Sequence, residues 1–257
     1  LKYDEKNVPL YNLPIYEGAC SPRKEYALYP GTLSYKYPVA GQPNSRLTLH
    51  SYDIETRKNK TITLAHGNYE YIPRIYSTPE SDKILAVTLN RDQNRMEIYA
   101  VNPKSTLSSS IYVDQAQNAW IEPDAYEALR IMPQSFILSS SRSGYRHYYE
   151  YSYSGALIRQ ITSGDYDVTA LSGYDADSQT YYMQSCRNGA VNRTLSSIDR
   201  KGQIKDISPA QGCASAIFSP NAKYYLESYS SLSQAPSYIL KSAKGKEIKN
   251  FGDNTAY

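Results

Sequence analysis

The sequence predicts an all-β protein, a β-propeller assembled from four-stranded antiparallel sheets. Three observations lead to this prediction. Apolar patterns of helical period are nearly absent from the 257 residues. Short runs of alternating or β-branched residues recur along the chain, and each run is closed by Gly, Pro, Asn or Asp, as strands commonly are. Turns of similar sequence return every 45 to 50 residues, which is the repeat length of a four-stranded propeller blade.

Strands can be assigned directly from these runs. The clear ones are Leu47–Tyr52, Ile84–Leu89, Met96–Val101, Phe136–Ser140, Tyr148–Tyr153, Thr180–Ser185, Tyr224–Ser228 and Ser237–Leu240. The 28 tyrosines, against 3 Phe and 1 Trp, favour half-exposed strand faces, because Tyr pairs well across strands and tolerates a partly wet position. A carbohydrate-stacking surface is the alternative interpretation. Residues 1–32 precede the first unit and are expected to be irregular.

Two sets of turns, in phase with each other, define the repeat. The first set precedes the third strand of each unit, at steps of 50, 50, 45 and 45 residues, and is marked by Asn44, Asn94, Gly144, Gly189 and Gln234. The second set lies between the first two strands, at steps of 54, 42 and 45 residues, and is marked by Pro79, Pro133, Asp175 and Pro220. This period predicts about five blades. Stacked β-sandwiches, which have no fixed period, remain the alternative.

Composition excludes several classes of protein. The net charge of +3 is small and interspersed, so a nucleic-acid-binding surface is not expected. No apolar run approaches 18 residues, so no segment is expected to span a membrane. Cys20, Cys186 and Cys213 are too few and too far apart for a disulfide scaffold or a zinc site. Neither a metal nor another cofactor is expected.

Several motifs resemble a known family. The stretch Phe218–Tyr225 resembles the Phe-Ser-Pro-Asp-Gly-Lys turn of enzyme-associated propellers, with Asn and Ala replacing Asp and Gly. The stretch Tyr35–Asn44 resembles the Tyr-Pro-x-Ala-Gly-x-x-Asn segment in the N-terminal propeller of dipeptidyl peptidase IV and its bacterial relatives. Further matching segments follow in the family's order: Tyr71–Arg74, Leu89–Asn94, Ser141–His147, Ile161–Val168 and Tyr229–Ser231. The resemblance runs from about residue 4 to residue 253.

The resemblance carries expectations about domain organisation. In that family an eight-bladed propeller caps an α/β-hydrolase domain, and the two enclose the active site. Residues 1–257 would then form one partial propeller domain, about five blades of the eight-bladed ring. The hydrolase would lie downstream. The family's glutamate pair, which binds the substrate's free amine, would lie just upstream of the stretch Asp4–Leu10. Both are therefore expected to be absent from this chain.

The residues agree with a chain that carries no catalytic machinery. No Gly-x-Ser-x-Gly pentapeptide occurs, and a nucleophile elbow needs those small residues around its serine. The histidines, His50, His66 and His147, are expected to be structural or solvated, and the resemblance makes His147 a packing residue at a blade hairpin. The pair Asp4-Glu5 lies in a terminal stretch and is expected to be solvated. No catalytic residue is therefore assigned.

Two residues are singled out as candidates for the substrate cavity, Trp120 and Tyr126. Animal members of the family place an aromatic–Arg pair on a loop shortly after a Trp that corresponds to Trp120. The segment Trp120–Tyr126 contains no Arg, so that role is not carried over. Trp120 is expected to pack within a blade, with a ligand contact as the alternative, and Tyr126 is a candidate for lining the cavity.

The resemblance also bears on the thiols. Animal relatives bridge the strand that contains Cys213 to the next strand, where the partner would fall at Tyr229. That partner is absent here, so three free thiols are expected.

The function implied is that of a non-catalytic propeller fragment of a serine exopeptidase. The whole enzyme would release X-Pro or X-Ala dipeptides from peptide N-termini, and the propeller would form the wall that admits and selects peptides. Expected partners are peptide substrates, the protein's own C-terminal hydrolase domain and a second copy in a homodimer. The parent protein is expected to be periplasmic or exported. A free-standing propeller scaffold that binds protein or glycan is the alternative.

Overall fold

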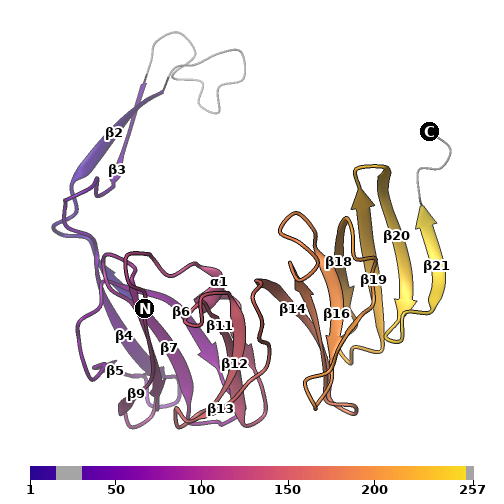
Figure 1. Cartoon of the computed structure of the whole chain (residues 1–257). Coiled ribbons are helices and arrows are strands. Elements are labelled where there is room, and N and C mark those ends of the chain that lie inside the picture. The colour runs from indigo at the N-terminus through magenta and orange to yellow at the C-terminus, as the bar shows by residue number, and fades with distance from the viewer. Residues whose placement is uncertain (16–30, 253–257) are drawn as a thin grey trace. The chain divides into compact units, whose positions relative to one another are not determined.

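The computed structural model describes residues 1–15 and 31–252, so Cys20 lies outside the described residues. The chain divides into two compact units, residues 1–120 and residues 121–257, and each unit is described by itself. In the described residues every element except one four-residue helix is a strand, and all strand pairs within the sheets are antiparallel (Figure 1). The all-β prediction is confirmed.

The first unit holds two propeller-type sheets and one separate hairpin. Its first sheet has the order β1-β4-β5, with β1 (Lys2–Asp4), β4 (Arg46–Asp53) and β5 (Lys58–Ile62). Its second sheet has the order β6-β7-β8-β9, with β6 (Tyr71–Ser77), β7 (Ile84–Leu89), β8 (Arg95–Val101) and β9 (Ser108–Gln115). The hairpin consists of β2 (Leu10–Ile15) and β3 (Gly31–Lys36).

The second unit begins with the helix α1 (Asp124–Glu127) and continues with three sheets of four strands each. The first of these contains β10 (Arg130–Ile131), β11 (Ser135–Ser140), β12 (His147–Ser152) and β13 (Leu157–Gln160). The next contains β14 (Val168–Asp175), β15 (Thr180–Ser185), β16 (Thr194–Ile198) and β17 (Ile204–Asp206). The last contains β18 (Cys213–Phe218), β19 (Tyr224–Ser231), β20 (Gln234–Ser242) and β21 (Glu247–Gly252).

The start of the chain differs from the prediction. Residues 1–32 were expected to be irregular, and that expectation is wrong for the described part. Lys2–Asp4 pair with β4 in the first sheet, and β2 pairs with β3 along its whole length. The hairpin is therefore an insertion between two neighbouring strands of one sheet. Its base is anchored by Val8, which is 3% exposed and whose carbonyl accepts a hydrogen bond of 2.7 Å from Lys36 Nζ.

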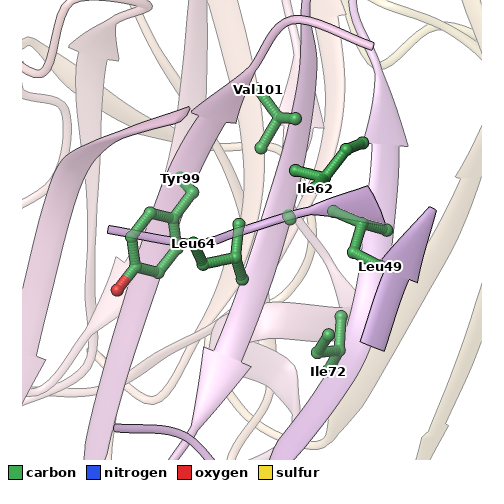
Figure 2. Packing of buried hydrophobic residues seen from close by; sticks show 7 residues of the cluster. Leu49, Ile62, Leu64, Ile72, Tyr99 and Val101 are labelled. Carbon is green, nitrogen blue, oxygen red and sulfur yellow. The ribbon is translucent and has the colours of Figure 1, made fainter. Parts of the chain in front are cut away.

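Apolar side chains from consecutive sheets form the cores. Figure 2 shows the cluster in the first unit, where Leu49 and Ile62 of the first sheet meet Tyr99 and Val101 of the second. A second cluster joins β10–β13 to β14–β17 through Ile137, Tyr181 and Met183, among others. A third joins β14–β17 to β18–β21, through the residues Leu195, Ala214 and Tyr225. Successive strand residues point to opposite faces, so each sheet can pack on both of its neighbours, as propeller blades do.

Tyrosine side chains contribute more to these cores than was expected from the sequence. Among the described residues ten tyrosines are buried, whereas eight are strongly exposed. The expectation that tyrosines lie on half-exposed strand faces is therefore wrong for the ten buried ones. A stack of three rings shows the reason: Phe218 lies 4.6 Å from Tyr182 and 4.9 Å from Tyr225, between centroids, in the interface of two sheets. Aromatic rings fill such a flat interface with large contact area.

Candidate functional site

One edge of the second unit gathers α1 and three turns. Because the strands of each sheet alternate in direction, the turns 141–146, 186–193 and 232–233 lie at the strand ends where β10 also begins. Contacts between sheets agree: Val168 N donates to Arg146 O at 2.9 Å, and Arg193 N donates to Gly212 O, just before β18, at 2.9 Å. We call this edge the α1 edge. The turns at the other ends of the strands form the opposite edge, where Lys223 bridges to Asp175 at 2.8 Å.

The helix α1 is held against its sheet by burial and by one ion pair. Pro123 precedes the helix with φ of −51°, which suits a helix start. Ala125 and Tyr126 are 8% and 7% exposed, so this side of the short helix is buried. On the other side, Asp124 Oδ2 lies 2.6 Å from Arg146 Nη1 in the turn 141–146. The helix is therefore a fixed part of the α1 edge, although four residues are too few for a stable helix alone.

The structure places the two candidate residues differently. Trp120 is 69% exposed, so the expectation that it packs within a blade is wrong. Tyr126 is only 7% exposed in α1, and in this arrangement it contributes packing rather than an open surface. Whether either residue lines a substrate cavity stays a prediction.

The described histidines have structural partners. His147 is 1% exposed. Its Nε2 lies 2.8 Å from Gly164 O, and because a carbonyl oxygen can only accept, Nε2 donates the hydrogen bond. Nδ1 then accepts from Thr162 Oγ1 at 3.1 Å. His50 contacts two threonine hydroxyls, and His66 Nδ1 lies 2.6 Å from Glu97 Oε1. Within the described residues none of these hydrogen bonds joins a histidine to a serine or cysteine. The expected packing role of His147 is confirmed.

The described residues also bear on the metal, thiol and membrane expectations. In the part of the chain that the structure describes, no group of three or more His, Cys, Asp or Glu side chains could hold a metal ion. Cys186 and Cys213 are free thiols, which confirms the prediction for these two residues. Among the described helices, none is long and apolar enough to cross a membrane. Asp4 and Glu5 are exposed, as expected.

A network of polar groups fixes the turn 186–193 on the α1 edge. Asp206 accepts hydrogen bonds from Arg187 Nη1 at 2.5 Å, from Asn188 Nδ2 at 3.0 Å and from Ser196 Oγ at 2.7 Å. Burial opposes ionisation of this carboxyl, yet the bonds from Ser196, Asn188 and Arg187 outweigh it and keep the pKa of Asp206 below its ordinary value. Asp206 therefore ties this turn to the sheet and compensates the charge of Arg187.

At the α1 edge His147 bonds Thr162 and Gly164 rather than a serine or cysteine, so this histidine activates no hydroxyl or thiol nucleophile there. Sequence reasoning identified α1 only through Tyr126 and missed the Asp124–Arg146 pair. The signal was present, because Arg146 lies in the motif Ser141–His147 and carries a charge next to a buried strand.

Three comparisons agree on what the chain resembles. The sequence profile described as "Dipeptidyl peptidase IV (DPP IV) N-terminal region" matches residues 1–236. The crystal structure of Porphyromonas gingivalis dipeptidyl peptidase 4 superposes with a TM-score of 0.87 at 36% identity, over 99% of this chain and 35% of that one. Dipeptidyl peptidase 4 of Trichophyton rubrum is 25% identical over 271 residues, covering 100% of this chain and 34% of that protein. The chain therefore spans about a third of the length of the relatives it matches.

Proposed function

Since the chain belongs to the dipeptidyl peptidase IV N-terminal region family, we propose that it forms part of the propeller wall of a serine exopeptidase. The wall admits peptides and selects those from which X-Pro or X-Ala dipeptides are released. Residues 1–257 would be one partial propeller domain, and the nucleophile would come from a hydrolase domain of the same polypeptide. The observation that carries the proposal is the match over nearly the whole chain to about a third of a dipeptidyl peptidase 4.

The residue types and contacts of this chain favour a role in contacting peptides over a role in catalysis. Acyl transfer needs an activated nucleophile, a base and oxyanion donors within hydrogen-bond reach. The 257 residues contain no Gly-x-Ser-x-Gly elbow. His147, which lies in the α1-edge half of its sheet, uses both ring nitrogens for Thr162 and Gly164. Its imidazole is thus occupied by the fold and is not available as a base.

We assign the peptide-contacting role within this chain to Trp120. Its exposed ring offers a large apolar face to a ligand, and aromatic anchors of this kind contribute strongly to binding. Tyr126, being buried, would support the segment by packing. In the whole polypeptide encoded by the gene, Trp120→Ala should raise KM for a dipeptidyl reporter and leave kcat nearly unchanged.

The matched control for this test is Tyr52→Ala, which removes another exposed aromatic ring, at the end of β4. An unchanged KM for the Trp120 variant, or an equal effect of both variants, would remove Trp120 from the proposed wall. Absence of dipeptide release by the unaltered whole polypeptide, together with binding of protein or glycan, would favour the free-standing scaffold instead.

We also propose that a second copy covers the hairpin β2–β3. An isolated two-stranded hairpin is marginal in water. Three rings cluster on it, with centroid distances of 6.0 Å for Tyr11–Tyr35, 5.7 Å for Tyr11–Tyr37 and 5.8 Å for Tyr35–Tyr37, and all three are exposed. The strand β2 carries no charged side chain that would guard it against association.

Sedimentation of the whole polypeptide tests the homodimer. Tyr11→Ser combined with Tyr35→Ser should shift the protein from dimer to monomer, because the apolar cluster would be lost while the anchor Val8 stays buried. A dimer of unchanged affinity in this variant would place the interface elsewhere.

A further inference from the structure

Arg130, the first residue of β10, is a partly buried cation whose charge the fold does not compensate. Within the described residues its guanidinium makes no hydrogen bond and no ion pair. The other partly buried arginines of the second unit all donate to acceptors within the protein, and they are Arg146, Arg159, Arg187 and Arg193. Burial lowers the pKa of the Arg130 guanidinium, but an arginine stays protonated in proteins. A positive charge therefore remains there without a counter-ion.

The strand register shows which face Arg130 occupies. Arg130 is paired with Ile137, Ile137 with Glu150, and Glu150 with Arg159. Residues directly opposite each other in antiparallel strands share a face, so these four side chains form one row across the sheet. Ile137 packs in the same cluster as Tyr181. The row therefore faces the neighbouring sheet β14–β17.

The carboxylate in this row is engaged away from Arg130. Glu150 Oε1 accepts a hydrogen bond of 2.6 Å from Ser135 Oγ, and Glu150 Oε2 accepts one of 2.8 Å from Arg159 Nε. The end of the row at β13 is thus compensated. The end at β10 is not.

The neighbouring sheet offers tyrosines to Arg130 rather than an acid. Tyr174 and Tyr181 lie close enough to interact with it electrostatically, and their rings stack 4.5 Å apart. Tyrosine hydroxyls are uncharged at neutral pH. The hydroxyl of Tyr181 already accepts a hydrogen bond of 3.1 Å from Arg159 Nη2. Neither ring neutralises the guanidinium.

Arg130 lies where the sheets of the second unit converge. The first strands β14 and β18 contact each other, and β14 also contacts β12 of the preceding sheet. The fourth strands β13 and β21 are instead largely exposed. In a propeller the converging strands surround a central channel. Arg130 begins the first strand of its sheet, three positions after α1 ends, so it lies at the α1 edge on the channel side.

From these observations we infer that Arg130 binds a carboxylate of the peptides that the wall admits, beyond the dipeptide that is released. The carboxylate belongs either to the C-terminus of the peptide or to an Asp or Glu side chain. The inference rests on the proposed function, because that function supplies the peptides. A partly buried charge without a partner costs free energy that a bound anion recovers. A carboxylate fits best, since it accepts two parallel hydrogen bonds from a guanidinium.

Kinetics of the whole polypeptide on matched peptides test the inference. Ala-Pro followed by one to four alanines is assayed as the free acid and as the C-terminal amide. Amidated peptides with one Glu or one Gln after Ala-Pro form the second pair. In at least one pair the carboxylate should lower KM by about tenfold, as one charge-assisted hydrogen-bonded pair would, and Arg130→Gln should abolish the difference. Equal KM values within both pairs, or a preference that survives in Arg130→Gln, would overturn the inference.

A reporter and a control variant separate binding from folding. A Gly-Pro chromogenic reporter carries no carboxylate, so its KM should be the same in Arg130→Gln and in the unaltered protein. Arg200→Gln removes an exposed arginine from the turn between β16 and β17 and should leave every KM unchanged. Arg130→Lys keeps the charge and should retain part of the preference. A rise in KM that is equal for the reporter and for the carboxylate peptides would mean that Arg130 is merely structural.

Calorimetric titration measures binding without turnover. The probes are tetraglycine as acid and as amide, and the amides of Gly-Gly-Glu-Gly and Gly-Gly-Gln-Gly, which have neither Pro nor Ala at the second position. A protein that releases dipeptides but shows no carboxylate preference in either assay defeats only this inference. A preference that depends on Arg130, in a protein that releases no dipeptide, defeats only the proposed function.

Discussion

At the scale of single residues, buried polar groups keep the sheets of each unit together. Glu97 of β8 is the clearest case, because it is 5% exposed and receives His66 from the segment after β5. Arg95 Nη2 lies 3.5 Å from its other oxygen. Burial opposes the charge, yet hydrogen bonds from Ser110, His66 and Tyr99 hold the pKa of Glu97 below its ordinary value.

The substitution Glu97→Gln should destabilise the chain by about 2 kcal/mol at pH 7, because it removes charge-assisted hydrogen bonds from a buried position. A carboxyl whose pKa is lowered on folding contributes stability above its unfolded pKa of about 4.5 and loses that contribution as pH falls through the folded value. The difference in the free energy of unfolding between the unaltered chain and the Glu97→Gln variant should therefore narrow below pH 4.5. Urea unfolding at pH 7, 5 and 3.5 measures this difference. A difference that does not depend on pH would show that the charge of Glu97 does not contribute to stability.

At the scale of elements, the accuracy with which a strand can be predicted from sequence depends on its length and on its local pattern of apolar residues. All eight strands assigned from alternating or β-branched runs fall inside or overlap observed strands, and Ile84–Leu89 and Thr180–Ser185 agree to the residue. These two strands are marked by runs that are buried almost continuously, because both of their faces pack on neighbouring sheets. The turn at Gln234 was placed too late, since β20 already begins at that residue.

Other elements could not be predicted, for identifiable physical reasons. Pro236 suggested a turn, but it lies inside β20 near an irregularity of the pairing with β19, where a missing N–H is tolerated. The strand β1 has three residues, too few to show a period. The hairpin β2–β3 has no buried face to impose alternation. Exposure of Trp120 depends on tertiary packing, which local sequence does not encode.

The close approach of two sheets gives a prediction at this scale. A Cβ at Gly173 of β14 would lie 2.8 Å from Phe218 Cγ, and Phe218 stacks on Tyr182 and Tyr225. Gly→Ala in an ordinary strand conformation normally stabilises by about 0.4–1 kcal/mol. Gly173→Ala should instead destabilise by about 1–3 kcal/mol, because the added carbon overpacks the interface.

Thermal and urea unfolding measure this change, and a second variant identifies its cause. Gly173→Ala combined with Phe218→Leu removes ring atoms from the clash and should be less destabilised than the sum of the two single changes. Additive effects would mean that Gly173 is required for some reason other than its contact with Phe218.

At the scale of the whole molecule, the described residues contain five propeller-type sheets, four of them with four strands. The face of the last sheet that points away from β14–β17 carries exposed Ile217, Tyr224 and Tyr238. Such a face is the kind that neighbouring sheets cover elsewhere in the chain, through the clusters around Tyr181 and Tyr225. These features agree with a part of a larger propeller, which is the premise of the proposed function.

The most direct test of that proposal is dipeptide release from Gly-Pro and Ala-Pro chromogenic reporters, measured for residues 1–257 and for the whole polypeptide side by side. The proposal predicts no release by residues 1–257 above a mock-purified control, and release by the whole polypeptide that a serine-directed inhibitor abolishes. Inhibitor-sensitive release by residues 1–257 alone, or no release by the whole polypeptide, would contradict it.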